Sequence, residues 1–178
     1  MISCTHENME EFLPSQFLAD NIHILSKGLA LDVAMGGGRN AVFLAQNGFE
    51  VEGVDISELA IENSLELAKE RKVNIKVKLV DLETNYTIKA NSYNLIICFN
   101  YLQRSLIPQI KAGIKTGGMI VYETFIIDQV RFGRPHNPDF LLKYNELLEL
   151  FRDFRCLRYR EGVIEDRRAI ASLIAQKI

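Results

Sequence analysis

The stretch from Leu29 to Asn40 constrains the fold more than any other part of the chain. An apolar run over residues 29–34 carries one acid, Asp32, and leads directly into three consecutive glycines, Gly36 to Gly38. A helix-forming segment over residues 39–47 follows at once. Because glycine has no Cβ, a strand-to-helix turn built from glycines lets backbone N–H groups and a ligand approach each other closely. The pattern predicts a strand–turn–helix unit of an α/β fold.

Two acids flank this turn. Asp32 lies inside an otherwise apolar strand, where a carboxylate is costly to bury unless it accepts hydrogen bonds or meets a cation. Asp55 follows the next predicted strand, residues 49–54, and lies nineteen positions after Gly36. An acid at that distance can accept hydrogen bonds from the two hydroxyls of a ribose. The combination predicts a nucleoside-binding site; the alternative is a tight turn with a purely structural role.

Four segments carry a resemblance to a known family. Asp32-Val-Ala-Met-Gly-Gly-Gly38 resembles motif I of the class I S-adenosylmethionine-dependent methyltransferases, and Gly53-Val-Asp55 resembles their motif II. Residues 32–41, together with Asn100-Tyr-Leu-Gln-Arg104 and Tyr122-Glu-Thr-Phe125, resemble the small stand-alone methyltransferases grouped with tellurite-resistance proteins. The similarity runs from about Pro14 to the C-terminus. It implies S-adenosylmethionine as cofactor and methyl transfer as the activity.

Apolar runs with strand character alternate with helical patterns, which favours a parallel sheet flanked by helices. The predicted strands cover residues 29–34, 49–54, 75–80, 93–99, 119–124, 155–161 and 168–176. The predicted helices cover residues 9–25, 39–47, 58–71, 103–114 and 140–151. The resemblance implies one Rossmann-like, doubly wound α/β sheet of seven strands, order 3-2-1-4-5-7-6, with strand seven antiparallel. The ligand of such a sheet lies beyond the carboxyl ends of the strands, at the point where their order reverses.

Length and composition suit one globular domain over residues 1–178, with an N-terminal helical segment at about 9–25. No apolar run reaches the about 18 residues of a membrane span, and residues 1–11 carry acids where a signal peptide has cations. The three cysteines lack metal-ligand spacing. We therefore expect a cytoplasmic protein, monomer or homodimer, that holds no metal and binds no membrane.

The net charge of −2 and the pI near 6.0 give no electrostatic reason to bind nucleic acid. Four arginines near the C-terminus alternate with apolar residues, which we interpret as the solvated side of a strand: Arg152, Arg155, Arg158 and Arg160. The sequence also has no Asn/Asp-Pro-Pro-aromatic segment after the strand at 93–99, which argues against methylation of DNA bases. The expected partner is a small-molecule acceptor.

The resemblance implies a role for each residue at the turn and strand ends. At the nucleoside end, Asp55 binds the ribose, Ile56 covers the adenine, and Asp81 and the Leu82 amide contact the adenine edge. Asp81 has an alternative role as a turn cap. The complete set of cofactor-binding candidates is Asp32, Ala34, Gly36, Gly38, Arg39, Asn40, Asp55, Ile56, Asp81, Leu82, Phe99 and Asn100.

At the methionyl end, Asp32 anchors the amine, and a carbonyl of Phe99 or Asn100 assists it. Arg39 at the helix start pairs with the carboxylate or, alternatively, points to water; Asn40 has the same two alternatives. Gly36 and Gly38 bring the backbone close to the ligand.

Methyl transfer needs orientation and exclusion of water, and it needs a general base only where the acceptor must lose a proton. The candidates at the acceptor end are Arg104, Arg134 and His136, the last two in the loop 131–138 after the strand at 119–124. Arg104, Arg131 and Arg134 suit an oxyanion such as tellurite or selenite, or a small carboxylate, and His136 is the candidate base. The alternative is that this loop is a rigid surface turn. Glu123 either lines the acceptor pocket or is a structural acid.

Two other functions compete with methyl transfer. A protein that binds S-adenosylmethionine without catalysis, as a partner or sensor, would carry the same binding residues. An NAD-dependent reductase would use a Gly-x-Gly-x-x-Gly turn, whereas Ala41 stands at the third glycine position here, and no Tyr-x-x-x-Lys pair is present.

Overall fold

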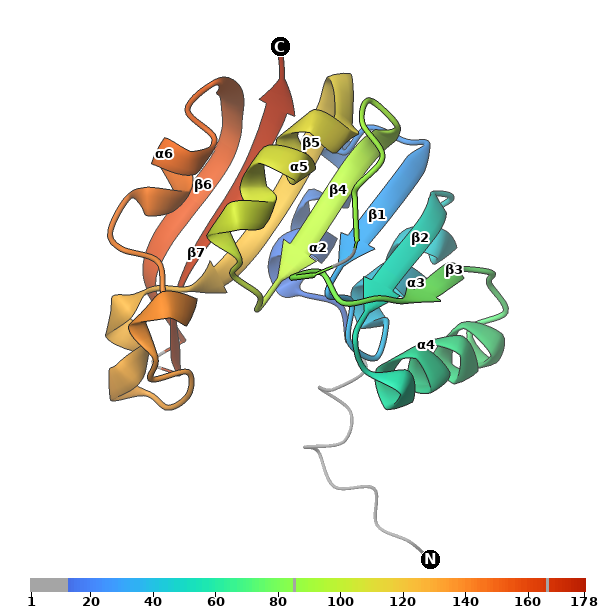
Figure 1. Ribbon diagram of the computed structural model, residues 1–178, viewed down its shortest axis with the longest axis horizontal. Helices are drawn as coiled ribbons and strands as arrows, with labels where there is room; N and C mark the ends of the chain where they lie inside the picture. The colour runs from blue at the N-terminus through green and yellow to red at the C-terminus, as the bar shows by residue number, and fades with distance from the viewer. Residues whose placement is uncertain (1–12, 85, 166) are drawn as a thin grey trace, which may run out of the picture.

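The computed structural model describes residues 13–84, 86–165 and 167–178. Its seven strands form one sheet in the order β3-β2-β1-β4-β5-β7-β6 (Figure 1). Strands β1 to β5 are parallel, and β7 is antiparallel to both β5 and β6. The predicted fold, strand order and direction of strand seven are therefore confirmed. The strands are β1 (Leu29–Val33), β2 (Glu50–Asp55), β3 (Lys76–Leu79), β4 (Tyr93–Phe99), β5 (Ile114–Phe125), β6 (Phe154–Ile164) and β7 (Arg168–Lys177).

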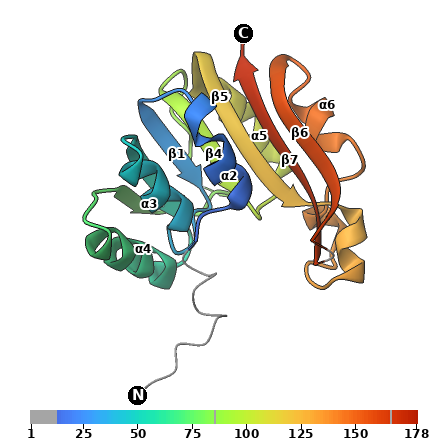
Figure 2. The same cartoon turned by 180° about the vertical axis from the view of Figure 1, so that it is seen from behind.

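Helices cover both faces of the sheet (Figures 1 and 2). On one face lie α2 (Gln16–Asn21) and α3 (Arg39–Gln46), and α4 (Glu58–Glu70) packs against α3. On the other face lie α5 (Ile107–Gly113) and α6 (Glu146–Leu150). Short 3₁₀ helices complete the connections: η1 (Ile22–Ile24), η2 (Arg104–Leu106), η3 (Ile127–Arg131) and η4 (Pro138–Phe140). No helix within the described ranges is both long and apolar enough to cross a membrane.

The central strands are apolar on both faces because helices cover both. Along β4, Leu95 and Ile97 pack into the cluster beneath α2 and α3, whereas Ile96 and Cys98 pack into the cluster beneath α5 and α6. The edge strand β3 shows the opposite pattern, with three of its four residues exposed. This burial fixes the plane of the sheet and therefore the positions of the residues that follow each strand.

Three predicted helices are shorter than their patterns suggested. Helix α2 begins only at Gln16, and residues 9–12 of the predicted helix lie outside the described residues. The predicted helix at 103–114 divides into η2 and α5, and Ile114 already belongs to β5. The predicted helix at 140–151 is reduced to α6, because Leu142 forms a parallel bridge with Ile126 and Asn145 has a left-handed backbone, φ +61°.

Candidate active site

A pocket of about 740 Å³ lies at the carboxyl ends of β1 and β4. This is the reversal point in strand order at which the sequence placed the ligand. Three parts of the chain line the pocket: the end of β1 with the glycine turn and the start of α3, the segment that follows β4, and one side of α4. The predicted residues among them are Asp32, Ala34, Gly36, Arg39, Asn40, Phe99 and Asn100.

The glycine turn is left-handed at three positions. Ala34, Gly36 and Gly38 have φ values of +55°, +55° and +78°. A Cβ on Gly36 would meet no atom of the described residues within 4 Å, so this residue faces open space in the pocket wall. A Cβ on Gly38 would lie 2.6 Å from the Cβ of Ser64. Gly38 is absent from the pocket lining, and the close packing of α3 against α4 is what requires glycine there.

Asp32 is the chemically distinctive residue of the pocket. It is 1% exposed, and its Oδ2 has no hydrogen-bond partner within the described residues. Burial raises the pKa of its carboxyl group to about 8; the charge of Asp55 adds to the effect, while the Ala41 amide and Arg39 oppose it. An unpaired buried acceptor is unfavourable. Because Asp32 lines the pocket, the arrangement fits a ligand that brings an ammonium or N–H group to its carboxylate.

Asp55 holds the turn from the neighbouring strand. Its Oδ2 accepts a hydrogen bond from the Gly36 amide at 2.8 Å, and its Oδ1 accepts one from the Ser57 amide at 3.0 Å. Each carboxylate oxygen keeps acceptor capacity for another donor. The residue is half-buried beside the exposed Ile56, and neither lines the pocket. Sequence reasoning gave Asp55 a ligand role and missed this structural one.

Asp81 and Leu82 follow the carboxyl end of β3, and they do not line the pocket. The Oδ1 of Asp81 accepts from the Glu83 amide at 2.8 Å, which is the turn-cap alternative of the prediction. Burial raises the pKa of Tyr101, which does line the pocket, to about 12, and the charges of Glu83, Asp81 and Asp55 add to this effect. The three acids therefore lie close enough to act electrostatically on this pocket-lining side chain.

Two asparagines line the pocket from different walls, Asn40 at the start of α3 and Asn100 after β4. Asn40 is buried, and its Oδ1 accepts a hydrogen bond from the Ser15 amide at 2.8 Å. Asn100 has a left-handed backbone, φ +56°, and its amide donates to the Glu123 carbonyl at 2.8 Å. Arg39 lies beside Asn40 in the lining, half-buried. The sequence found these residues, but not the contacts that hold them.

Arg104 does not lie where the sequence placed it. It was expected to face the reacting end of the pocket, but it does not line the pocket. Its Nε and Nη2 donate to the carboxylate of Glu146 at 2.6 and 2.9 Å, and it also donates to the carbonyls of Asp139 at 2.7 Å and Leu141 at 2.9 Å. Its charge is therefore matched by Glu146, and the side chain fastens the segment 139–146 to η2.

The loop 131–138 is anchored at its base. Gln129 is buried and donates from Nε2 to the Arg134 carbonyl at 3.2 Å, while its Oε1 accepts from the Ala169 amide at 2.8 Å. Arg134 and His136 are exposed and do not line the pocket. In this conformation the loop therefore presents its charged side chains to solvent rather than to the cofactor pocket.

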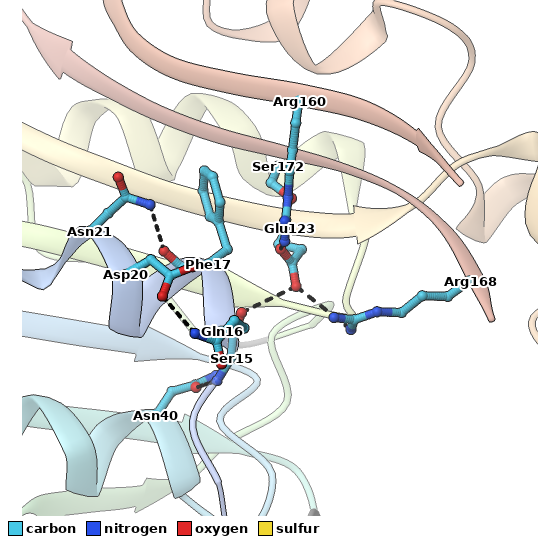
Figure 3. A network of polar contacts seen from close by, with 10 residues as sticks. All are labelled: Ser15, Gln16, Phe17, Asp20, Asn21, Asn40, Glu123, Arg160, Arg168 and Ser172. Atoms are coloured by element: carbon cyan, nitrogen blue, oxygen red, sulfur yellow. Dashed lines mark hydrogen bonds and ion pairs between the residues drawn. The ribbon is translucent and has the colours of Figure 1, made fainter. Parts of the chain in front are cut away.

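Glu123 is 1% exposed and lies at the centre of a polar network (Figure 3). Its Oε2 accepts from Ser172 at 2.7 Å and from Arg160 at 3.2 Å. Its Oε1 accepts from Ser15 at 3.2 Å and lies 3.8 Å from Nη1 of Arg168. Glu123 is therefore a structural acid satisfied by side chains. Of the four arginines expected on the solvated side of a strand, Arg152, Arg155 and Arg158 are exposed, whereas Arg160 is half-buried and pairs with Glu123. The cross-strand registers, which pair position 172 with both 123 and 160, bring these residues together.

Comparison with known proteins adds the family. The family model described as tellurite resistance protein TehB matches residues 11–172. The chain belongs to the TehB family. It is 28% identical over 156 residues to a probable S-adenosyl-L-methionine-dependent methyltransferase TehB of Haemophilus influenzae, covering 83% of this chain and 53% of that protein. It is also 29% identical over 142 residues to hemagglutinin 1 of Eikenella corrodens, covering 75% of this chain and 46% of that one.

The solved TehB structure from H. influenzae superposes with a TM-score of 0.76 at 24% identity, covering 91% of this chain and 62% of that one. The magnesium protoporphyrin IX methyltransferase of Synechocystis, solved with bound S-adenosylhomocysteine, gives a TM-score of 0.69 at 17% identity, covering 91% and 78%. The TehB fold is thus shared with methyltransferases. The chain spans about half the length of the curated relatives it matches.

Proposed function

We propose that this chain binds S-adenosylmethionine in the pocket between β1 and β4 and transfers its methyl group to a small acceptor. The observation that carries the proposal is the unpaired buried Oδ2 of Asp32, in a pocket wall beside the open Gly36. A methionyl ammonium donates the hydrogen bond that Oδ2 does not receive from the described residues, and its positive charge balances the negative charge of the carboxylate. The relatives named as methyltransferases support the same activity.

Each part of the cofactor has a matching group. Asp32 holds the methionyl amine, Arg39 pairs with the methionyl carboxylate, and the free lone pairs of Asp55 accept the ribose hydroxyls. Ile56, which is 67% exposed, is then covered by the adenine. Asp81 and the Leu82 amide bind the adenine edge. The bound sulfonium supplies an electrophilic methyl group, and the protein's contribution is to orient the acceptor and exclude water.

For the acceptor, we propose a small anion, either an oxyanion such as tellurite or selenite or a small carboxylate. Arg131 and Arg134 support this, because both are exposed and neither forms an ion pair with the described residues. Arg104 is not part of this proposal, because Glu146 already matches its charge. His136 in the same loop is the candidate base for an acceptor that must lose a proton.

The test is release of S-adenosylhomocysteine from S-adenosylmethionine in the presence of candidate acceptors: oxyanions, small carboxylates and thiols. Turnover with an anion, together with calorimetric binding of S-adenosylhomocysteine, supports the proposal. Binding without turnover of any acceptor favours the non-catalytic alternative. Binding of NAD without binding of S-adenosylhomocysteine overturns the proposal.

A further inference from the structure

The buried carboxylate of Glu123 is joined to both walls of the pocket. Through its backbone, the Glu123 carbonyl accepts from the Asn100 amide at 2.8 Å. Through its side chain, Glu123 accepts from the Ser15 hydroxyl at 3.2 Å, and the Ser15 amide donates to Asn40 at 2.8 Å. Asn40 and Asn100 both line the pocket, whereas Glu123 and Ser15 do not.

We infer that Glu123 is a positioning residue for the cofactor pocket, acting through Ser15 on the side chain of Asn40. The inference rests on the cofactor proposed above and is independent of the acceptor. Ser15 is the joint, because its hydroxyl binds Glu123 while its amide binds Asn40 (Figure 3). When Glu123 holds the Ser15 hydroxyl in place, the direction in which the Ser15 amide donates its hydrogen bond to Asn40 is therefore fixed as well.

The start of α3 depends on this joint. Its N-cap is Gly38, which has no side chain to cap the first turn. Asn40 lies in that first turn, and its Oδ1 is oriented by the Ser15 amide, which comes from outside the helix. A helix end without a side-chain cap is less firmly held than a capped one. The hydrogen bond from the Ser15 amide therefore helps to hold the first turn of α3 in position, which the helix's own cap does not do.

The other side of the network is rigid. Glu123, Ser172 and Arg160 come from three neighbouring strands, with Ser172 in register with both of the others. Ser172 donates to Glu123 at 2.7 Å and accepts from Nε of Arg160 at 3.1 Å. Arg160 also lies over the ring of Phe17 in α2, with its Cζ 4.9 Å from the ring centroid. The carboxylate is therefore held by the sheet and presents its Oε1 to Ser15 from a fixed position.

The structure offers a matched pair of variants to test the inference. Ser15 and Ser172 are both buried, and each donates one hydroxyl hydrogen bond to Glu123. Of the two serines, only Ser15 also binds a pocket-lining side chain within the described residues, that of Asn40. We expect Ser15→Ala to raise the Kd for S-adenosylhomocysteine roughly three- to tenfold, the value of one hydrogen bond. Ser172→Ala should stay within about twofold of the wild type, although both variants lower Tm.

Two further variants separate positioning from stability. Ser15→Thr keeps the hydroxyl and should bind nearly as tightly as the wild type. Glu123→Ala removes the acceptor of the Ser15 hydroxyl and should raise the Kd. Adding Ser15→Ala to it should raise the Kd no further, because both changes break the same link. Should Glu123→Ala fail to fold, the two serine variants still decide the question.

The outcomes distinguish the inference from the proposed function. If the wild type binds S-adenosylhomocysteine and Ser15→Ala binds equally well, or Ser172→Ala loses as much affinity, the positioning role is overturned and the cofactor proposal stands. If the wild type binds no S-adenosylhomocysteine by calorimetry, the cofactor proposal fails, and the positioning role fails with it.

Discussion

The carboxylate of Asp55 and the amide of Gly36 are joined by a 2.8 Å hydrogen bond that ties the end of β2 to the turn after β1. The acid that motif reasoning assigns to the ribose therefore also fixes the position of the glycine beside it. Binding and turn geometry are coupled in one side chain, so a substitution there acts on both.

Replacement of Asp55 by alanine tests this dual role. We expect Asp55→Ala to weaken binding of S-adenosylhomocysteine by about 1.5–3 kcal/mol, the range for hydrogen bonds to a charged group. It should also lower the free energy of unfolding by about 1–3 kcal/mol, because two backbone amides lose their acceptor. Calorimetry and urea denaturation measure the two effects. Asn137→Ala is the control, because Asn137 likewise accepts from a backbone amide two residues ahead, that of Asp139. A variant with normal affinity removes Asp55 from the binding site.

The raised pKa of Asp32 predicts how binding depends on pH. The carboxyl group has a pKa of about 8 in the folded protein, above the ordinary value of 3.8, because it is buried. A ligand ammonium favours the ionised form, so binding must release a proton below pH 8. Affinity for S-adenosylhomocysteine should therefore increase by up to about tenfold per pH unit between pH 6 and 8. Asp32→Asn should remove this dependence; a wild type with a flat profile would contradict the assignment.

The same shift predicts a stability profile for the free protein. The folded state keeps the Asp32 proton in the range where the unfolded chain has lost it. The contribution of Asp32 is therefore fully present below about pH 4 and is lost as the pH rises to about 8. In Asp32→Asn, the free energy of unfolding should lack this decrease with rising pH. Urea denaturation of both proteins at several pH values gives the comparison.

The two left-handed glycines should respond differently to the same substitution. Gly36→Ala adds a Cβ in open space, so the cost is the backbone strain of about 1–2 kcal/mol, and the main loss should be cofactor affinity. Gly38→Ala adds the same strain and also places a Cβ 2.6 Å from the Cβ of Ser64. We expect the larger fall in Tm for Gly38→Ala and its partial recovery in the double variant with Ser64→Gly. Equal Tm values for the two alanine variants would contradict the assignment of Gly38 to helix packing.

Alanine substitutions of Arg104 and Arg134 should affect different properties: the first should lower stability and the second should lower turnover. Arg104→Ala removes the ion-pair partner of the half-buried Glu146 and the donor to two carbonyls, so Tm should fall. Arg134→Ala should leave Tm unchanged and reduce turnover of an anionic acceptor more than that of an uncharged one. Cofactor affinity should stay normal in Arg134→Ala. Unchanged turnover there would identify the loop 131–138 as a plain surface turn.

The features that the sequence predicts best are those determined by residues close together in the chain. The unit from β1 through the glycine turn to α3 follows from a local pattern, and the predicted bounds of β4, Tyr93–Phe99, agree with the structure. The buried Asp32 was recognised because an acid in an apolar strand needs a partner. These features depend on residues close together in the chain.

The features that sequence reasoning missed are pairings between distant residues. Arg104 meets Glu146, and Glu123 meets Arg160, only because the tertiary arrangement and strand register place them side by side. Alternation predicted that Arg160 would be on one face of a strand but could not say what covers that face. The helix predicted at residues 140–151 was too long because a distant pairing decides its start. The bridge between Ile126 and Leu142 overrides the local helical pattern.

The place of β7 in the sheet has a consequence for the order in which the protein is made. β7 lies between β5 and β6, although both precede it in the chain. As the chain leaves the ribosome, β6 therefore emerges before the strand that pairs with it. Arg160 can take its position beside Glu123 only when β7 has been inserted, so the contact of Arg160 with the Phe17 ring in α2 also waits for β7.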